Sequence, residues 1–223
     1  CLFPKRLVLT AAPDLLDRIR PMMADAAAAA GFWTWKVVPE IDCLVRLPSI
    51  RERSPVVVAD IGHTATRFYS FEEPDDPGVA HGERGPGGLA MQHAVVDAFR
   101  ERHNLMIGVR TARDVLEQAT EHPVDRQDRR GRSYETGLPA QVSLDASEIR
   151  EYILPICRRI GVAFAPVRGR MSCAGKPRIH LTGGGAKAPG LSDLLAAQLA
   201  VLVSVSDEQA FEVVRRLGVC LAI

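Results

Sequence analysis

The chain has 223 residues, of which 47% are apolar and 25% charged, and 28 Lys and Arg against 27 Asp and Glu leave a net charge of +1. This is the composition of a folded protein with one large or two small domains. The charge balance excludes a strongly basic, sequence-independent nucleic-acid binder, and no apolar run reaches the ~18 residues of a transmembrane helix. Five cysteines without a CxxC pair argue against a disulfide framework or a zinc site and favour a reduced, cytoplasmic compartment.

Runs of β-branched and aromatic residues predict strands, and apolar residues at helical spacing predict helices. In chain order we expect strand 5–10, helix 15–30, strand 33–38, helix 40–47, strands 55–60 and 64–71, helices 89–102 and 111–119, strand-like pieces in 134–144, helix 147–160, strand 178–182, helix 192–199, strand 201–206 and helix 208–221. Segments 72–88, 121–132 and 166–175 are expected to be loops, the first with a short edge strand at 79–81. This alternation predicts an α/β fold with a mixed sheet.

Two prolines fall inside the expected helices. Pro21 is expected to kink the first helix or to delay its start, because proline lacks the amide hydrogen of an interior helical residue. Pro155 is expected to interrupt helix 147–160 for the same reason.

A first candidate site follows strand 55–60, whose continuous apolar run predicts a central strand covered on both faces. Asp60 ends this strand and Gly62 opens a tight turn. A carboxylate beside a glycine turn can hold a magnesium-bound water, and the amide groups of the turn can face a phosphate. The alternative is a plain β-hairpin in which Asp60 caps the turn, which is a common arrangement.

A second candidate site is the triple glycine 183–185, between strand 178–182 and helix 192–199. Glycines let the backbone approach a ligand where a Cβ atom would clash, and a following helix offers free N–H donors. The alternative is a flexible connector between strand and helix. The spacing matches neither GxGxxG nor GxxxxGK[ST], so a Rossmann or P-loop site is not indicated.

Four segments together resemble the MreB family of bacterial actin-like, rod-shape-determining proteins. They are VVVADIGHTATRF (56–68), NLMIGVRTARDVLE (104–117), RGRSYETGLPAQVSLDASEIRE (130–151) and IHLTGGGAKAPGLSDLL (179–195). The resemblance implies an actin-like, RNase H-like ATPase-type fold, made mainly of the family's domain II with part of domain I. The family's first phosphate loop has no counterpart here, and the chain begins with Cys1, so we expect it to lack an upstream part.

The resemblance also implies a domain division. Residues 1–52 correspond to the remainder of domain I, and residues 53–207 correspond to domain II, with a small subdomain inserted at about 109–146. Residues 208–223 correspond to a carboxy-terminal helix that returns to domain I.

For the nucleotide, the resemblance assigns Asp60, as a ligand of magnesium through water, and Gly62 to the family's second phosphate turn. His63, Thr64 and Ala65 occupy positions where the family has two glycines and a threonine. Two Cβ atoms therefore stand where phosphates would approach. The resemblance thus implies ATP and Mg²⁺ as cofactors, bound at an altered turn.

The resemblance gives two further nucleotide contacts. The nucleoside-contact segment of the family is matched by Gly108, Val109, Arg110 and Thr111. Val109 replaces the family's glutamate, so a ribose hydrogen bond is expected to be lost. The turn for adenine and the α-phosphate is matched by Gly183, Gly184, Gly185 and Ala186.

Two more roles follow from the resemblance, each with a plainer alternative. Asp17 falls near the family's water-orienting glutamate, but it is also a favourable acid for the first turn of a helix. Leu2 and Phe3 match a hydrophobic loop that touches the membrane surface in some members, but they also suit an ordinary chain end.

The function implied is that of an ATP-linked filament subunit for cell shape and morphogenesis, in the cytoplasm at the inner face of the cell membrane. Its partners would be further copies or other MreB-like subunits and membrane proteins of the shape-determining complex, without nucleic acid. Because the first phosphate turn is missing and the second altered, ATP hydrolysis is expected to be weak or absent. The alternatives are a nucleotide-free docking module of that complex and a decayed fragment.

Overall fold

The computed structural model describes residues 6–45, 50, 52, 55–73, 77–171 and 178–206. The elements are β1 (Arg6–Ala11), η1 (Pro13–Leu15), α1 (Leu16–Ala29), β2 (Thr34–Pro39), α2 (Glu40–Leu44), β3 (Val56–Ile61), β4 (Ala65–Phe71), β5 (Val79–Pro86), α4 (Gly88–His103), β6 (Leu105–Met106), α5 (Val109–Glu121), β7 (Gln127–Ser133), β8 (Pro139–Leu144), α6 (Ala146–Gly169), β9 (Arg178–Thr182), α7 (Leu191–Leu199) and β10 (Leu202–Val205). The expected helix 208–221, Leu2 and Phe3 lie outside the described residues. No helix in the described ranges is long and apolar enough to cross a bilayer.

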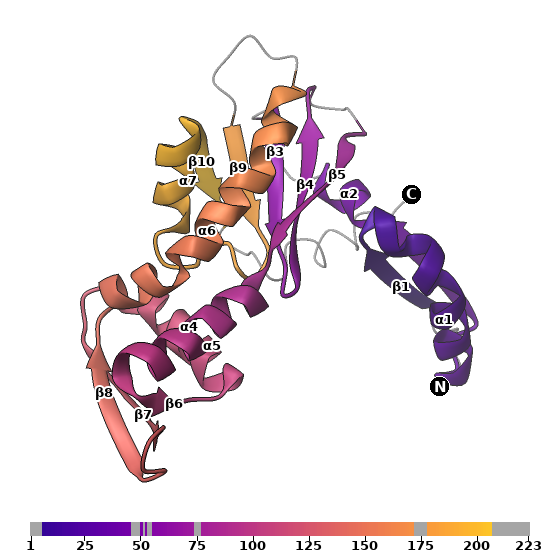
Figure 1. The fold of residues 1–223 in the computed structure, drawn as a ribbon. Coiled ribbons are helices and arrows are strands. Elements are labelled where there is room, and N and C mark those ends of the chain that lie inside the picture. The colour runs from indigo at the N-terminus through magenta and orange to yellow at the C-terminus, as the bar shows by residue number, and fades with distance from the viewer. Residues whose placement is uncertain are drawn as a thin grey trace.

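The largest sheet has five strands in the order β10-β9-β3-β4-β5 (Figure 1). β3 runs parallel to β9 and antiparallel to β4, so the sheet is mixed, as predicted. Every residue of β3 is buried. The predicted central position of this strand, covered on both faces, is therefore confirmed.

Each face of this sheet has its own apolar cluster. On one face, Val57, Ala59 and Ile61 pack with residues of α4, α6 and α7. The rings of Phe68 on β4 and Phe164 on α6 lie 5.8 Å apart within this cluster. On the other face, Val56 and Val58 pack with residues of α2 and β4, in a smaller cluster that includes Ile41, Leu44, Ile50, Tyr69 and Phe71. Burial on both faces explains why the β3 sequence is continuously apolar.

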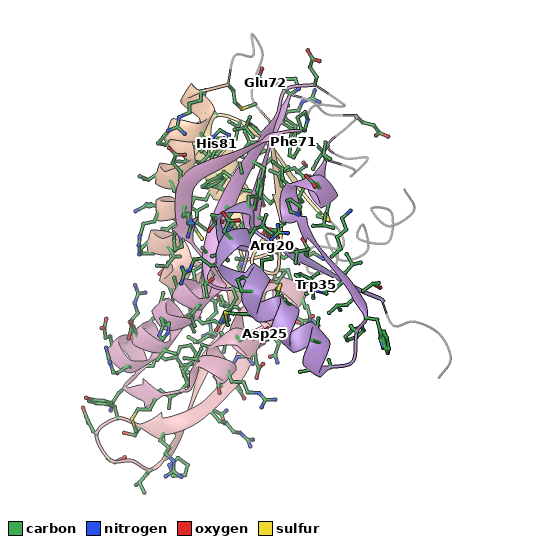
Figure 2. All side chains as sticks on the ribbon, turned by 90° about the vertical axis from the view of Figure 1, so that its right-hand side faces the viewer. Arg20, Asp25, Trp35, Phe71, Glu72 and His81 are labelled. Carbon is green, nitrogen blue, oxygen red and sulfur yellow. The ribbon has the colours of Figure 1, made fainter. Side chains whose placement is uncertain are left out.

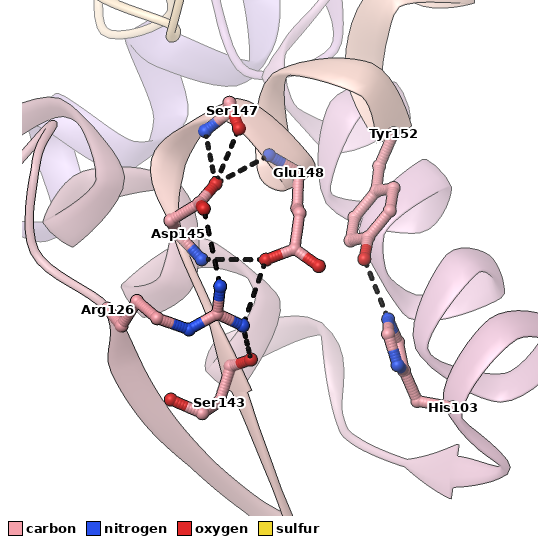
Figure 3. Close-up of polar contacts among 7 residues, drawn as sticks. All are labelled: His103, Arg126, Ser143, Asp145, Ser147, Glu148 and Tyr152. Atoms are coloured by element: carbon pink, nitrogen blue, oxygen red, sulfur yellow. Dashed lines mark hydrogen bonds and ion pairs between the residues drawn. The ribbon is translucent and has the colours of Figure 1, made fainter.

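A three-stranded antiparallel sheet, β6-β7-β8, lies beside α4 and α5 at the lower left of Figure 1. Its last strand leads into α6, whose first turn carries a capping box. Asp145 accepts hydrogen bonds from the Ser147 and Glu148 amides, at 2.9 and 3.0 Å, and Glu148 accepts one from the Asp145 amide at 3.1 Å (Figure 3). Arg126 pairs with both carboxylates and donates to the Ser143 carbonyl. These contacts fix the start of α6 relative to β8.

Residues 6–39 form a β-α-β unit in which β1 and β2 pair in parallel. Figure 2 shows this unit from its outer side, with Arg20 and Asp25 on α1 and Trp35 on β2, and with Phe71 and His81 on the five-stranded sheet. Asp14 forms ion pairs with Arg67 on β4 and Arg84 on β5. The unit is thereby linked electrostatically to the edge of the larger sheet.

Three expectations about local structure were wrong. Segment 121–132 contains most of strand β7, although its residues are polar, because the backbone of β7 pairs with β8 from Gln127 to Arg132. The short edge strand expected at 79–81 extends to Pro86 as β5.

Helix α6 runs from Ala146 to Gly169 without stopping at Pro155 or Pro166. Burial of one face of α6 in the core outweighs the local loss of hydrogen bonds at these prolines.

Pro21 likewise lies inside α1 and does not delay its start beyond Leu16. Pro21 is exposed, so its ring meets no packed neighbour on the core side. The remaining elements agree with the predicted ones to within a few residues, except that α2 ends at Leu44 and the two-residue strand β6 was not predicted.

Candidate functional site

The turn between β3 and β4 is fastened to the start of α4. The amide of Gly62 donates to the Ala65 carbonyl at 3.0 Å, and the Gly88 amide donates to the Gly62 carbonyl at 3.0 Å. A Cβ atom on Gly87 would lie 2.5 Å from the Ala65 nitrogen and 2.6 Å from the Gly62 oxygen. Gly87 is therefore required because two backbone segments meet there.

The triple glycine packs against the end of β3. Gly183 has φ +83°, and a Cβ atom on it would lie 2.3 Å from Asp60 Oδ1. A Cβ atom on Gly185 would lie 2.5 Å from Ile61 Cγ2, and the Gly185 amide donates to the Ile61 carbonyl at 2.9 Å. Gly184 has open space around its Cβ position. The segment is thus held in place at both ends, and Gly184 alone of the three faces free space.

The two turns and helix α5 enclose a cavity of about 580 Å³. Its lining residues are Gly62, His63, Gly88, Met91, Gln92, Arg113, Leu116, Glu117, Thr120, Glu121, Gly184, Gly185, Lys187 and Ala188. The volume is within the range of small-molecule sites, about 300–1,000 Å³. Four residues assigned by resemblance, Gly62, His63, Gly184 and Gly185, come together in this cavity.

Charged residues on α5 and on the loop after β9 line the same cavity, and the sequence reasoning did not single them out. Arg113 Nε donates to Glu117 Oε1 at 2.7 Å, and Lys187 of the 184–188 loop is also among the lining residues. Thr120 donates to the Lys187 carbonyl at 3.0 Å, which ties α5 to the loop. The spacing of Arg113, Glu117 and Thr120 along one helical face was the available signal.

The other residues assigned to nucleotide contacts do not line this cavity. Gly108 is the N-cap of α5, and Val109, Arg110 and Thr111 form its first turn, before the lining residues Arg113 and Glu117. Gly183 and Ala186 lie behind the lining, Ala186 being buried. Thr64 is exposed on the hairpin turn and is not among the lining residues.

Asp17 lies in the first turn of α1 and is exposed. It is not among the lining residues of the cavity. The arrangement matches the plainer alternative, a helix acid near the positive end of the helix dipole.

Asp60 is 8% exposed and lies close enough to Glu40 of α2 to feel its charge. Two effects raise the pKa of Asp60 to about 7: burial of the carboxyl group, which contributes most, and the nearby Glu40. Tyr69 on β4 donates to Glu40 Oε2 at 2.9 Å, and burial raises the pKa of Tyr69 above its ordinary value. The sequence analysis did not identify Glu40 and Tyr69 as site residues. The available signal for Glu40 was its position directly after a strand.

These residues do not fit the magnesium site that the family resemblance implies. A magnesium-bound water needs a solvent-accessible carboxylate beside the phosphates. The Asp60 side chain is instead buried, its Oδ1 lies against Gly183, and it is not among the residues lining the cavity. In the described ranges, no three His, Cys, Asp or Glu side chains cluster as a metal site.

The fold is that of an actin-like protein. The crystal structure of MreB5 of Spiroplasma citri bound to ADP superimposes with a TM-score of 0.78 over 97% of this chain and 68% of that chain, at 16% identity. The MreB5 structure bound to AMPPNP gives 0.77 over the same shares, also at 16% identity. The chain therefore has the actin-like α/β fold that the sequence predicted.

The MreB/Mbl protein family model matches residues 79–222, and the chain belongs to this family. The cell shape-determining protein Mbl of Bacillus subtilis (strain 168) is 32% identical over 122 residues, which are 51% of this chain and 37% of that protein. The match thus spans little more than a third of the length of this curated relative. Family membership classes the chain with the actin-like proteins of the cell-shape cytoskeleton.

Proposed function

We propose that the chain is an MreB-like cytoskeletal subunit that binds an adenine nucleotide in the cavity between the 62–64 turn, the 184–188 loop and α5. The observation that carries this proposal is the convergence of Gly62, His63, Gly184 and Gly185 around one cavity. Structures of MreB5 with ADP and AMPPNP have the same fold, which supports an adenine nucleotide as the ligand.

The lining suits the nucleoside part of such a ligand. Met91 and Leu116 offer apolar surface for a base, and the Glu117 carboxylate can accept hydrogen bonds from ribose hydroxyls. Glu117 would then replace the family's glutamate, which is Val109 in this chain. Arg113 holds Glu117 from the preceding turn and would keep its carboxylate oriented.

For the filament role, we propose that nucleotide binding favours head-to-tail association with further copies or with other MreB-like subunits. A repeated contact between unlike surfaces of identical subunits generates an open filament. We place the protein in the cytoplasm at the inner membrane face, with membrane proteins of the shape-determining complex as partners. Hydrolysis is expected to be weak, because Asp17 is not among the lining residues of the cavity and Asp60 is buried.

The test is binding of a fluorescent ATP analogue to the purified chain. We expect a Kd at or below about 10 μM, equivalent to roughly 7 kcal/mol of binding free energy. Gly184→Val should abolish binding, because its side chain would enter the cavity from a position with free space. Gly169→Val is the matched control, since Gly169 also has free space and lies at the far end of α6.

A nucleotide-free docking module is the second candidate. It is favoured by the engagement of the Gly62, Gly185 and Ala186 amides in backbone hydrogen bonds, which removes donors from a phosphate. Absence of binding at millimolar ATP, in a chain shown by circular dichroism to be folded, would reject the nucleotide site and leave this candidate.

A further inference from the structure

We infer that Lys187, together with His63, binds the phosphate groups of the nucleotide through side-chain contacts that need no magnesium ion. This inference rests on the proposed nucleotide site and names the groups that compensate the charged end of the ligand. It takes the place of the magnesium-mediated contact that the resemblance assigns to Asp60, because the Asp60 side chain is buried and is not among the lining residues.

The first argument is the balance of charge around the cavity. The phosphate groups of ADP or ATP are negatively charged, and a charge that leaves water is costly unless it is paired. The cavity is lined by two acids, Glu117 and Glu121, and by the cations Arg113 and Lys187. Arg113 donates to Glu117 at 2.7 Å, so its charge is already paired. Lys187 makes no ion pair within the part of the chain that the structure describes, and it is therefore the cation available to an anionic ligand.

The second argument is that the backbone fixes both residues while their side chains remain free. The Lys187 carbonyl accepts the Thr120 hydroxyl at 3.0 Å, which ties the residue to α5. The His63 carbonyl accepts the Leu89 amide at 2.7 Å, which ties the residue to the first turn of α4. Both side chains are exposed, and neither the ammonium group nor the imidazole ring is hydrogen-bonded among the described residues. Each residue thus offers a polar group to the cavity from a fixed position.

The third argument compares these side chains with the amides of the turns. The Gly62 and Gly185 amides donate to backbone carbonyls at 3.0 and 2.9 Å, so they are not available to a ligand. An ammonium group forms a charge-assisted hydrogen bond, which is roughly twice as strong as a bond between neutral groups. His63 stands where the resemblance expects a glycine, and its ring N–H is a donor that glycine lacks. We therefore expect these side chains, and Lys187 above all, to provide much of the affinity for phosphate.

Calorimetry with adenosine and ADP, each with magnesium chloride and with EDTA, tests the inference on the purified chain. We expect ADP to bind at least about tenfold more tightly than adenosine, and magnesium to change the Kd of ADP by less than about threefold. ADP that binds no more tightly than adenosine, or magnesium that tightens ADP by more than about tenfold, would overturn the inference. Absence of binding by both ligands would instead reject the proposed function, and the inference with it.

Removal of the charge tests Lys187 itself. Lys187→Gln should weaken ADP about tenfold and adenosine by less than about twofold, because only ADP loses a charge-assisted contact. Added sodium chloride should weaken ADP binding to the unsubstituted chain more than to this variant. Lys36→Gln is the matched control, since Lys36 is also an exposed lysine but lies on β2 and does not line the cavity. Equal losses for both ligands, or no loss for ADP, would overturn the inference.

A labelling measurement gives the same information without any substitution. The sequence contains four lysines, of which Lys36 and Lys187 lie in the described ranges. ADP should protect Lys187 from acylation by an amine-reactive ester, as measured by mass spectrometry, and should leave Lys36 equally reactive. Adenosine should protect Lys187 much less. Equal protection by the two ligands would place Lys187 beside the nucleoside, and absence of protection by saturating ADP would remove it from the site, so either result would overturn the inference.

Discussion

Tyr69 donates a 2.9 Å hydrogen bond to Glu40, from the middle of β4 to the first residue of α2. The Glu40 carboxylate also lies near Asp60 on the neighbouring strand β3, and it raises the pKa of that carboxyl group. The face of the sheet toward α2 therefore contains two carboxyl groups and a phenol in contact, with Arg67 as the nearby cation. We therefore expect the stability of the fold to depend on pH through Asp60.

Stability should fall as the pH rises from about 4 to about 7. The pKa of Asp60 is raised from 3.8 to about 7, so in this interval the folded protein retains a proton that the unfolded chain has released. The contribution is complete below pH 4 and is lost above pH 7, and it amounts to at most about 4 kcal/mol. Urea unfolding between pH 4.5 and 8 measures the slope. Asp60→Asn, which cannot titrate, should flatten it; an unchanged slope would assign the pH dependence to other groups.

Replacing Pro155 should stabilise the protein. Pro155 is exposed in the interior of α6, where it cannot donate to the carbonyl one turn earlier. Pro155→Ala restores that donor, and we expect the free energy of unfolding to rise by roughly 1–3 kcal/mol. Chemical denaturation measures the difference. The exposed Arg158→Ala change in the same helix is the control and should have little effect; destabilisation by Pro155→Ala would mean that α6 needs a bend there.

Gly183 and Gly184 should differ in their tolerance of substitution by alanine. Gly183→Ala places a Cβ atom against Asp60 and Ile61 at a positive φ, so a loss of about 2 kcal/mol or more is expected. Gly184→Ala enters free space and should change stability by less than about 1 kcal/mol. Thermal unfolding of the two variants provides the comparison, and equal losses would contradict the packing described for this turn.

Removing the cap of α6 should lower the melting temperature. Asp145→Ala leaves the Ser147 and Glu148 amides without their acceptor, and we expect Tm to fall by roughly 2–4 °C (Figure 3). Asp145→Asn keeps an acceptor oxygen at the same place and should recover most of the loss. If both variants melt alike, the charge of Asp145 beside Arg126, and not the cap, is the stabilising feature.

The sequence by itself determined the fold class, the buried strand β3 and the two glycine turns, because apolar periodicity and glycine position are local signals. It could not show that polar strand β7 forms, since β7 depends on pairing with β8. It also could not show that α6 continues past two prolines, because burial of the helix face supplies that stability.

At the candidate site, the family resemblance assigned Gly62, His63, Gly184 and Gly185 to one ligand, and the structure brings them to one cavity although more than a hundred residues separate the two turns. Only the tertiary structure turned Asp60 toward Glu40 and brought Glu117 and Lys187 to the cavity. Side-chain direction depends on which faces of neighbouring elements are buried together, and that is a property of the packed sheet and helices and not of residue spacing.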